Sequence, residues 1–487
     1  MFVAINNADM NIFHVDEWIK RTRDANDGII SPKFAMDILG KTNHRGHIKT
    51  VIKNIKDRCK TTEDLAPYKE FILSCVDGRK MSKQAVANLR EMASIGGFEE
   101  EFDETHKKRK FYEELDAEGV TIKRISDFED LEGENLVVYI NVVDDGDLSG
   151  YDFGNIKKIR FMEGAEIDLS FATNLPEDLD VSKCSSVDLG WCDLSQIKNL
   201  KFGNWAEVVL NGATNLPEDL DVSMCSEVYL CECDLSQIKN LKFREGAEVA
   251  LDGATNLPED LDVSMCSEVY LCECDLSPIK NLKFGNRADV DLYKATNLPE
   301  DLDLSMCSKV DLRYCDLMGL KKLKFRDGAV VRLSVVENLP EDLDVSMCSE
   351  VYLCECDLSP VKELKFREGA VVKLEQAVNL PEDLDVSMCV NINLERCDLS
   401  NVKELKFREG AEVALNGATN LPEDLDFSMC SYIILSGCDL SRVKKLKFID
   451  KAQEDEFMEN AMNFNGKVEY MIDGKNVVPF ADLGMDM

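Results

Sequence analysis

Histidine and catalytic signatures are nearly absent from this sequence. Only four of the 487 residues are histidines, and all of them precede the repeated part of the chain: His14, His44, His47 and His106. The Cys-x-Cys pairs at 231/233, 272/274 and 354/356 therefore lack histidine partners for a closed zinc site. The sequence also contains no phosphate-binding loop, no HExxH and no GxSxG. We expect no metal, no cofactor and no enzyme activity.

Long apolar runs are missing as well. No stretch approaches the roughly 18 consecutive apolar residues that cross a membrane. The opening MFVAINNADMNIF has neither a basic start nor a sustained apolar segment, so no signal peptide is visible. These absences predict a chain without a membrane partner, located in the cytoplasm.

What the sequence does contain is repetition. The heptapeptide NLPEDLD begins every 41 residues, at Asn174, Asn215, Asn256, Asn297, Asn338, Asn379 and Asn420. A period kept without insertions indicates stacked units whose length is fixed by geometry. Each unit divides again into coils of 20 or 21 residues, because Leu220-Asp221-Val222 recurs as Leu241-Lys242-Phe243. Two short alternating runs in each coil, LDV or LKF and then VYL or VAL, predict two strands per coil and two parallel sheets.

The coils carry a recognisable spacing. Cys225, Val228, Leu230, Cys233 and Leu235 follow the pattern L-x-x-L-x-L-x-x-N/C-x-L, with cysteine in the first leucine position. Residues 137–448 therefore resemble leucine-rich-repeat proteins, although Ala254 occupies the Cys/Asn position of the alternate coil. The short coil is typical of a flattened β-solenoid as well as of a horseshoe. Either resemblance implies a surface that binds another macromolecule, usually a protein, without chemistry.

We expect an α+β protein in which the two kinds of structure occupy separate domains. Residues 1–119 form an all-α domain, with helices predicted at 14–25, 32–40, 46–59, 62–76, 82–94 and 99–118. Residues 120–450 form a leucine-rich-repeat-like parallel β-solenoid of about 14–15 coils, whose first, capping coil covers about 120–150. Residues 451–487 form a C-terminal cap and tail, with a helix predicted near 454–463.

Charge is distributed unevenly between these parts. The whole chain has a net charge of −36, and residues 1–119 contribute only −1 of it, so the solenoid and tail carry −35. One interpretation is attraction of a basic partner, or mimicry of nucleic acid. The alternative is pairing between coils, since an offset of 21 residues sets Glu177 against Lys198 and Glu218 against Lys239, with Asp180 and Asp221 against Lys201 and Lys242. Such pairs favour one register between coils.

Fourteen of the 19 cysteines fall into two columns with the 41-residue period. They are Cys184, Cys225, Cys266, Cys307, Cys348, Cys389 and Cys430, and Cys192, Cys233, Cys274, Cys315, Cys356, Cys397 and Cys438. Members of a column are two coils apart, about 9 to 10 Å, which exceeds the roughly 4.4 to 6.8 Å that a disulfide needs. We expect buried, reduced cysteines and a reducing compartment.

Residues 31–58 resemble a helix-turn-helix. The second predicted helix carries basic residues that could contact nucleic acid: Arg45, His47, Lys49, Lys53 and Lys56. The alternative is an amphipathic helix with Ile48, Val51, Ile52 and Ile55 inward and its lysines in water. Both interpretations remain open at this stage.

Candidate binding residues lie where the copies differ from one another. The Cys-Glu pair that follows several VxL strands is replaced by Tyr293-Lys294 and Arg313-Tyr314, with Arg332 one coil further on. Aromatic and arginine side chains are common interface anchors, and the outward positions of neighbouring strands hold further tyrosines, Tyr229, Tyr270 and Tyr352. Drift on a tolerant surface would give the same pattern.

The sequence as a whole predicts a non-enzymatic scaffold that presents an acidic repeat surface to a protein partner, which could be basic. The alternative is a regulator whose helical domain binds nucleic acid through residues 31–58, or a solenoid that mimics nucleic acid.

Overall fold

The computed structural model describes residues 29–41, 45–77, 81–106, 109, 122–124, 137–139, 147–154, 159, 161–198, 200–320, 323–448, 467–472 and 476–479. The predicted helices at 14–25 and near 454–463 lie outside these residues. Two compact units make up the chain: Met1–Asp145 with Arg160–Glu163, and Gly146–Ile159 with Gly164–Met487.

The first unit contains the helices. They are α2 (Pro32–Lys41), α3 (Arg45–Arg58), α4 (Thr62–Leu65), the 3₁₀ helix η3 (Ala66–Tyr68), α5 (Lys69–Asp77) and α6 (Lys83–Gly96), and residues 99–106 are also helical. The single helix predicted at 62–76 is interrupted at η3, where Pro67 lacks the N–H group that a continuous helix needs. Ser82 caps α6 by accepting a hydrogen bond from the backbone of Ala85, and Gly97 ends it at a φ of 78°.

The apolar face of α3 is buried, as one of the two interpretations of this segment requires. Ile48, Val51, Ile52 and Ile55 are at most 2% exposed and belong to one core with residues of α2, α5 and α6. Helix α3 is therefore amphipathic, with its basic residues outside this core. The same unit includes two short strands, β1 (Ile122–Arg124) and β2 (Val137–Tyr139), which pair in parallel.

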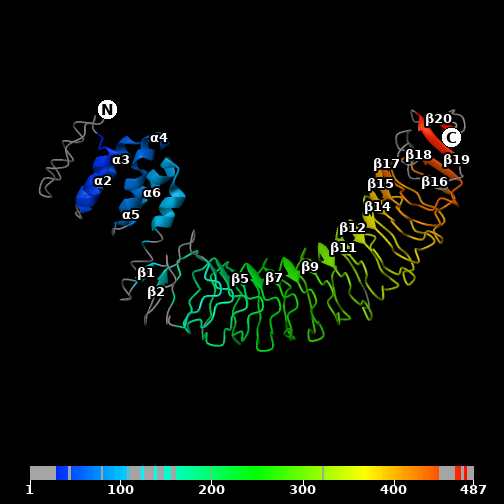
Figure 1. Ribbon diagram of the computed structural model, residues 1–487, viewed down its shortest axis with the longest axis horizontal. Coiled ribbons are helices and arrows are strands. Elements are labelled where there is room, and N and C mark those ends of the chain that lie inside the picture. The colour runs from blue at the N-terminus through cyan, green and yellow to red at the C-terminus, as the bar shows by residue number, and fades with distance from the viewer. Residues whose placement is uncertain are drawn as a thin grey trace. The chain divides into compact units, whose positions relative to one another are not determined.

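The second unit is a parallel β-solenoid, which confirms the predicted fold class. One sheet of 14 strands runs along one side of the coil stack in sequence order, as Figure 1 shows for β5, β7, β9 and β11. Its strands are β3 (Glu166–Asp168), β4 (Ser186–Asp188), β5 (Glu207–Val209), β6 (Glu227–Tyr229), β7 (Glu248–Ala250), β8 (Glu268–Tyr270), β9 (Asp289–Asp291), β10 (Lys309–Asp311), β11 (Val330–Arg332), β12 (Glu350–Tyr352), β13 (Val371–Lys373), β14 (Asn391–Asn393), β15 (Ala411–Ala414) and β17 (Cys430–Ile434).

In the described part of the array, the LDV and LKF runs do not form a second continuous sheet over most of its length, so that expectation was wrong. The LDV and LKF runs meet their neighbours through isolated bridges such as Lys201 with Asp221. Turns close on both sides of the LDV run, from Leu220 N–H to the Pro217 carbonyl and from Cys225 N–H to the Val222 carbonyl, so very little of that run is extended. Only at the C-terminal end do β16 (Asp424–Asp426), β18 (Lys445–Phe448), β19 (Lys467–Ile472) and β20 (Asn476–Pro479) form a sheet of four strands.

The core of each coil is built from aliphatic side chains and thiols. All fourteen cysteines of the two columns are buried, and none of them forms a disulfide. In the second column the thiol donates a hydrogen bond to a backbone carbonyl of the preceding coil, as from Cys233 Sγ to Leu210 O at 3.0 Å. Burial raises the pKa of Cys184 and Cys225 to about 12, which keeps these thiols protonated and poorly reactive.

Every coil turns sharply after its sheet strand. The second residue of this turn has a positive φ in each coil, which we call the left-handed column: Gly150, Phe171, Trp191, Gly212, Glu232, Gly253, Glu273, Lys294, Tyr314, Val335, Glu355, Gln376, Arg396, Gly417 and Gly437. Glycine adopts this backbone conformation without the steric cost that a Cβ imposes. The fold itself therefore favours glycine in this column, and larger residues there require another explanation.

Candidate binding surface

The outward side chains of the 14-stranded sheet include half of the candidate residues, Tyr229, Tyr270, Arg332 and Tyr352, and the other half lie in the turns directly after β9 and β10. In nearly every strand the middle residue is buried while the first and third are partly exposed. We call the first and third side chains of β3–β15, and the equivalent ones of β17, the sheet face. Since the strands are in register, each of these positions forms a continuous column along the solenoid.

The structure brings four of the sequence candidates into one cluster, the central patch. The Tyr293 and Tyr314 rings meet edge to face, with 5.3 Å between their centroids. The ammonium of Lys294 lies 5.1 Å from the Tyr293 ring centroid, and the Arg313 guanidinium lies 5.3 Å from the same point. Tyr293 is thus the centre of the patch, contacted by two cations and one aromatic edge.

A buried carboxylate joins Arg332 to this patch. Asp311 is only 2% exposed. Its Oδ2 lies 2.7 Å from Nη2 of Arg313 and 3.8 Å from Nη1 of Arg332. Arg332 also lies 5.6 Å from the ring of Tyr352 on the next strand. Because a buried charge is costly unless it is paired, both arginines have a structural role before any partner arrives.

Two of the patch residues occupy the left-handed column. Lys294 has a φ of 55° and Tyr314 a φ of 62°. Lys294 forms an ion pair of 3.0 Å with Glu273 of the preceding coil. Tyr314, in contrast, is about half exposed and its ring is the part of the patch most open to a partner.

The remaining tyrosine candidates donate hydrogen bonds to glutamates of the sheet face. Tyr229 donates its hydroxyl to Glu227 at 2.8 Å and contacts Glu248 at 3.1 Å. Tyr270 donates to Glu268 at 2.6 Å, and Tyr352 donates to Glu350 at 2.7 Å. Burial raises the pKa of Tyr229 most, whereas the hydrogen-bonded glutamates raise the pKa values of Tyr270 and Tyr352 most, so the phenols stay protonated. Tyr352 reaches the central patch through Arg332, whereas Tyr229 and Tyr270 lie on β6 and β8.

Sequence reasoning missed a column of five consecutive acids beside Tyr229 and Tyr270. This acidic ladder comprises Glu207, Glu227, Glu248, Glu268 and Asp289, each the register partner of the next. All five are partly buried, and no lysine or arginine among the described residues forms an ion pair with any of them. Burial, together with Glu268, Glu227 and Glu207, raises the pKa of Glu248. The signal was present in the sequence as an acid directly before the valine of each VxL run from β5 to β9.

The LDV and LKF runs, on another side of each coil, arrange their acids differently. Aspartate and lysine alternate along its bridges, as in Lys201 with Asp221, Lys242 with Asp262 and Lys283 with Asp303. Glutamates and lysines pair beside them, including Glu177 with Lys198 at 2.7 Å, Glu218 with Lys239 and Glu423 with Lys444 at 2.6 Å. The pairing predicted from the 21-residue offset is therefore present for the glutamates. We call this surface the paired run.

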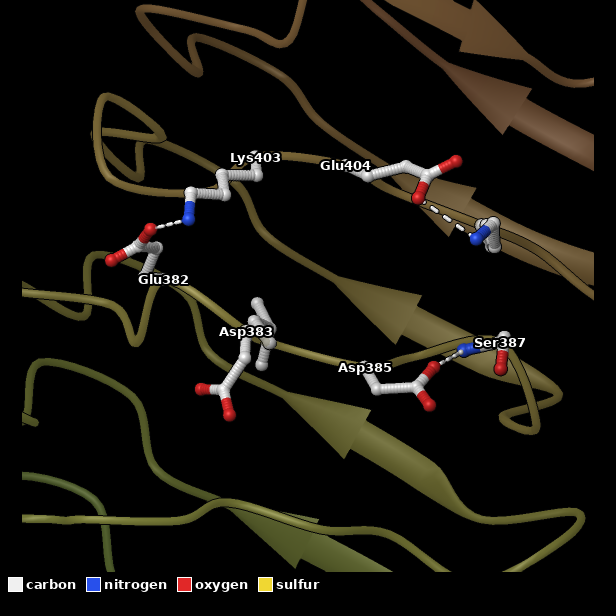
Figure 2. A pocket seen from close by; sticks show the side chains of 8 residues that line it. Glu382, Asp383, Asp385, Ser387, Lys403 and Glu404 are labelled. Carbon is white, nitrogen blue, oxygen red and sulfur yellow. Dashed lines mark hydrogen bonds and ion pairs between the residues drawn. The ribbon is translucent and has the colours of Figure 1, made fainter.

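A hollow of about 710 Å³ on the paired run shows how its charges are compensated (Figure 2). Glu382 forms an ion pair with Lys403, and Glu404 pairs with Lys406 at 2.8 Å. Asp385 accepts a hydrogen bond of 2.9 Å from the backbone of Ser387. The carboxylates in these contacts are engaged within the protein, so the hollow is a weaker candidate for a cation than the acidic ladder.

The basic candidates of α3 are only partly available. Lys56 binds Glu91 at 2.6 Å and Asn88 at 2.7 Å, both on α6. Lys49 and Lys53 are exposed and His47 is partly buried, while the side chain of Arg45 lies outside the described residues. Two lysines thus remain on the outer face of the helix as candidates for phosphate contact.

The chain matches no protein-family model, no curated protein and no solved structure. Among the described residues, no helix is both long and apolar enough to cross a membrane.

Proposed function

We propose that this chain is a non-enzymatic scaffold whose sheet face binds a basic segment of a partner protein. The acidic ladder is the observation that carries the proposal. Five carboxylates at the spacing of neighbouring strands repel one another, and a cationic segment laid along the column would relieve that repulsion. Tyr229 and Tyr270 hold three of these carboxylates in place and offer aromatic surface beside them.

The character of the coils supports a protein partner. The coil spacing resembles that of leucine-rich-repeat proteins, and stacked repeats of this kind present long surfaces that commonly bind proteins. A column of buried thiols fits a reducing compartment such as the cytoplasm.

The central patch would define where the basic segment ends. Lys309 follows Asp289 in the ladder column, Arg313 comes just after the strand of Lys309, and Arg332 lies on the next strand, β11. A basic segment would meet repulsion at this point, whereas an acidic or aromatic flank of the same partner would meet Lys294 and Tyr314. Complementarity of this kind fixes position along a surface more than it adds affinity.

Binding of a labelled peptide of eight lysines to the full chain tests the proposal. The variant carries Glu227→Gln, Glu248→Gln and Glu268→Gln, and the control carries Glu218→Gln, Glu259→Gln and Glu341→Gln. Both lose three negative charges, but only the first alters the acidic ladder. We expect fluorescence anisotropy to show a loss of about tenfold or more for the ladder variant and a several-fold smaller loss for the control. Equal losses would mean that net charge alone attracts the peptide, and the proposal would fail.

Nucleic-acid binding by the helical unit is the competing function, and Lys49 and Lys53 are its remaining support on α3. An electrophoretic shift of duplex DNA by the full chain, measured at low and moderate salt, separates the two. A shift that weakens steeply with salt and disappears in Lys49→Ala/Lys53→Ala would favour the nucleic-acid function. We expect no shift at moderate salt.

A further inference from the structure

Two large aromatic side chains lie exposed near the N-terminal end of the solenoid. Phe171 is 58% exposed and Trp191 is 52% exposed. Their rings are parallel to within 2°, with 6.1 Å between centroids. We call them the aromatic pair. Single exposed apolar residues are common on protein surfaces, but two adjacent large rings in water form a patch that calls for an explanation.

The fold does not require aromatic residues at these positions. Both belong to the left-handed column, with φ values of 59° and 61°, and glycine stands on either side of them at Gly150 and Gly212. A Cβ at Gly212 would lie 2.6 Å from the Trp191 ring, so that ring rests directly on the glycine. A Cβ at Gly150 would meet nothing within 4 Å. Within this column, Gly212 therefore supports the ring of Trp191, and the space at Gly150, next to Phe171 in the column, is open.

Three aspartates accompany the aromatic pair. Asp147 and Asp168 form a bridge, and Asp168 is the register partner of Asp188. Each carboxylate accepts a hydrogen bond from the backbone two residues later: Asp168 from Ser170 at 2.8 Å and Asp188 from Gly190 at 2.7 Å. These bonds hold the carboxylates towards the turns that carry the rings. None of the three forms an ion pair with a cation of the described residues.

Trp205 shows what a completed site of this type looks like in the same protein. It is 66% exposed and also has a positive φ, but it precedes its strand. The guanidinium of Arg244 covers its ring, 3.0 Å from the centroid. In the described part of the chain no such cation covers Phe171 or Trp191.

From this arrangement we infer that the aromatic pair and its aspartates bind an arginine side chain of the basic partner segment. A guanidinium stacks on aromatic faces and donates paired hydrogen bonds to a carboxylate, whereas an ammonium acts as a strongly hydrated point charge. The inference rests on the proposed function, because it names the residue type that the partner places at the N-terminal end of the sheet face.

The test compares peptides of eight arginines and eight lysines on the full chain by fluorescence anisotropy. In Phe171→Gly/Trp191→Gly, glycine restores the residue found on both sides of the pair and suits the positive φ. We expect this variant to bind the arginine peptide about fivefold more weakly, as loss of a cation–π contact of ordinary strength implies, and the lysine peptide less than twofold more weakly. Trp205→Gly is the matched control, since it removes a ring already covered by Arg244, and should change neither affinity.

A second variant guards against misfolding of the first. Phe171→Leu/Trp191→Leu retains apolar bulk but removes the aromatic faces, and it should show the same selective loss for the arginine peptide. Unchanged arginine affinity in both variants, or equal losses for the two peptides, would overturn the inference. The proposed function would survive that outcome if the acidic-ladder variant still lost binding. If neither peptide bound the wild-type chain, both would fall.

Discussion

The paired run and the sheet face are made of the same coils, but negative charges are paired with lysines on the first and stand next to one another on the second. On the paired run, glutamate meets lysine and aspartate alternates with lysine from coil to coil. On the sheet face from β5 to β9, carboxylate follows carboxylate through five strands. Since both surfaces repeat with the same period, the architecture does not dictate the difference.

This difference separates charge that supports the fold from charge that is available to a partner. The paired run gains register from its alternation, because shifting a coil by one place would set like charges together. The acidic ladder gains nothing similar and retains its repulsion. The central patch is intermediate: its four clustered residues lie in the turns directly after β9 and β10, and the buried carboxylate beside them, Asp311, is compensated by Arg313 and Arg332.

The largest effect on stability is expected at Asp311. Asp311→Asn keeps the shape but removes the charge between Arg313 and Arg332, and hydrogen bonds to charged groups are worth about 1.5 to 3 kcal/mol. We expect a loss of about 2 kcal/mol in the free energy of unfolding, because both arginines can regain some water. Urea denaturation measures it. Glu218→Gln on the paired run is the control, within the range of about 0 to 1 kcal/mol of exposed ion pairs. Similar values for both would remove the distinction between buried and exposed charge.

Replacing a single glutamate by glutamine should change the stability of the protein by a smaller amount, and the change should have opposite signs on the sheet face and the paired run. Glu248→Gln removes repulsion from Glu227 and Glu268 and retains an oxygen for the Tyr229 hydroxyl, so it should stabilise the protein by about 0.2 to 1 kcal/mol. Glu259→Gln removes the partner of Lys280 and should destabilise it slightly. Thermal melts at low salt measure both, and the difference should shrink as salt screens the charges. Destabilisation by Glu248→Gln would show that the ladder supports the fold.

The period of the sequence was sufficient to predict the solenoid. Seven exact copies of NLPEDLD fixed the coil length, and the VxL runs became the strands of the long sheet. The LDV runs misled because their alternation is too short to show whether the backbone stays extended. The turns at Pro217 and Cys225, which limit that run, become visible only in three dimensions.

The binding surface was predicted less completely. Tyr293 and Tyr314 were found because they break the repeat, but the burial of Asp311 depends on both neighbouring coils and could not be anticipated. From β5 to β9 the acidic ladder agrees with the repeat consensus, so departures from the consensus did not reveal it. Phe171 and Trp191 do depart from their neighbours, and alignment of the turn positions along the whole array would have revealed them.

The smallest effect is a rise in stability as the pH falls from 7 towards the ordinary pKa values of carboxyl groups. The pKa of Glu248 is raised above its ordinary 4.5, mainly by burial, and burial also raises those of Asp188 and Asp291 above 3.8. The native state therefore binds these protons more tightly than the unfolded state does, and stability increases as the pH falls towards the ordinary values.

On the paired run, hydrogen bonds from Ser223 and Ser264 lower the pKa values of Asp221 and Asp262 below 3.8. That contribution stays constant above pH 3.8 and is lost below it. Melting temperatures should thus pass through a shallow maximum between pH 4 and 5. Glu248→Gln should reduce the rise in melting temperature from neutral pH to this maximum and leave the fall on its acidic side unchanged. If the melting temperature of the wild type instead fell continuously from pH 7 downwards, the proposed repulsion between the carboxylates of the acidic ladder would be contradicted.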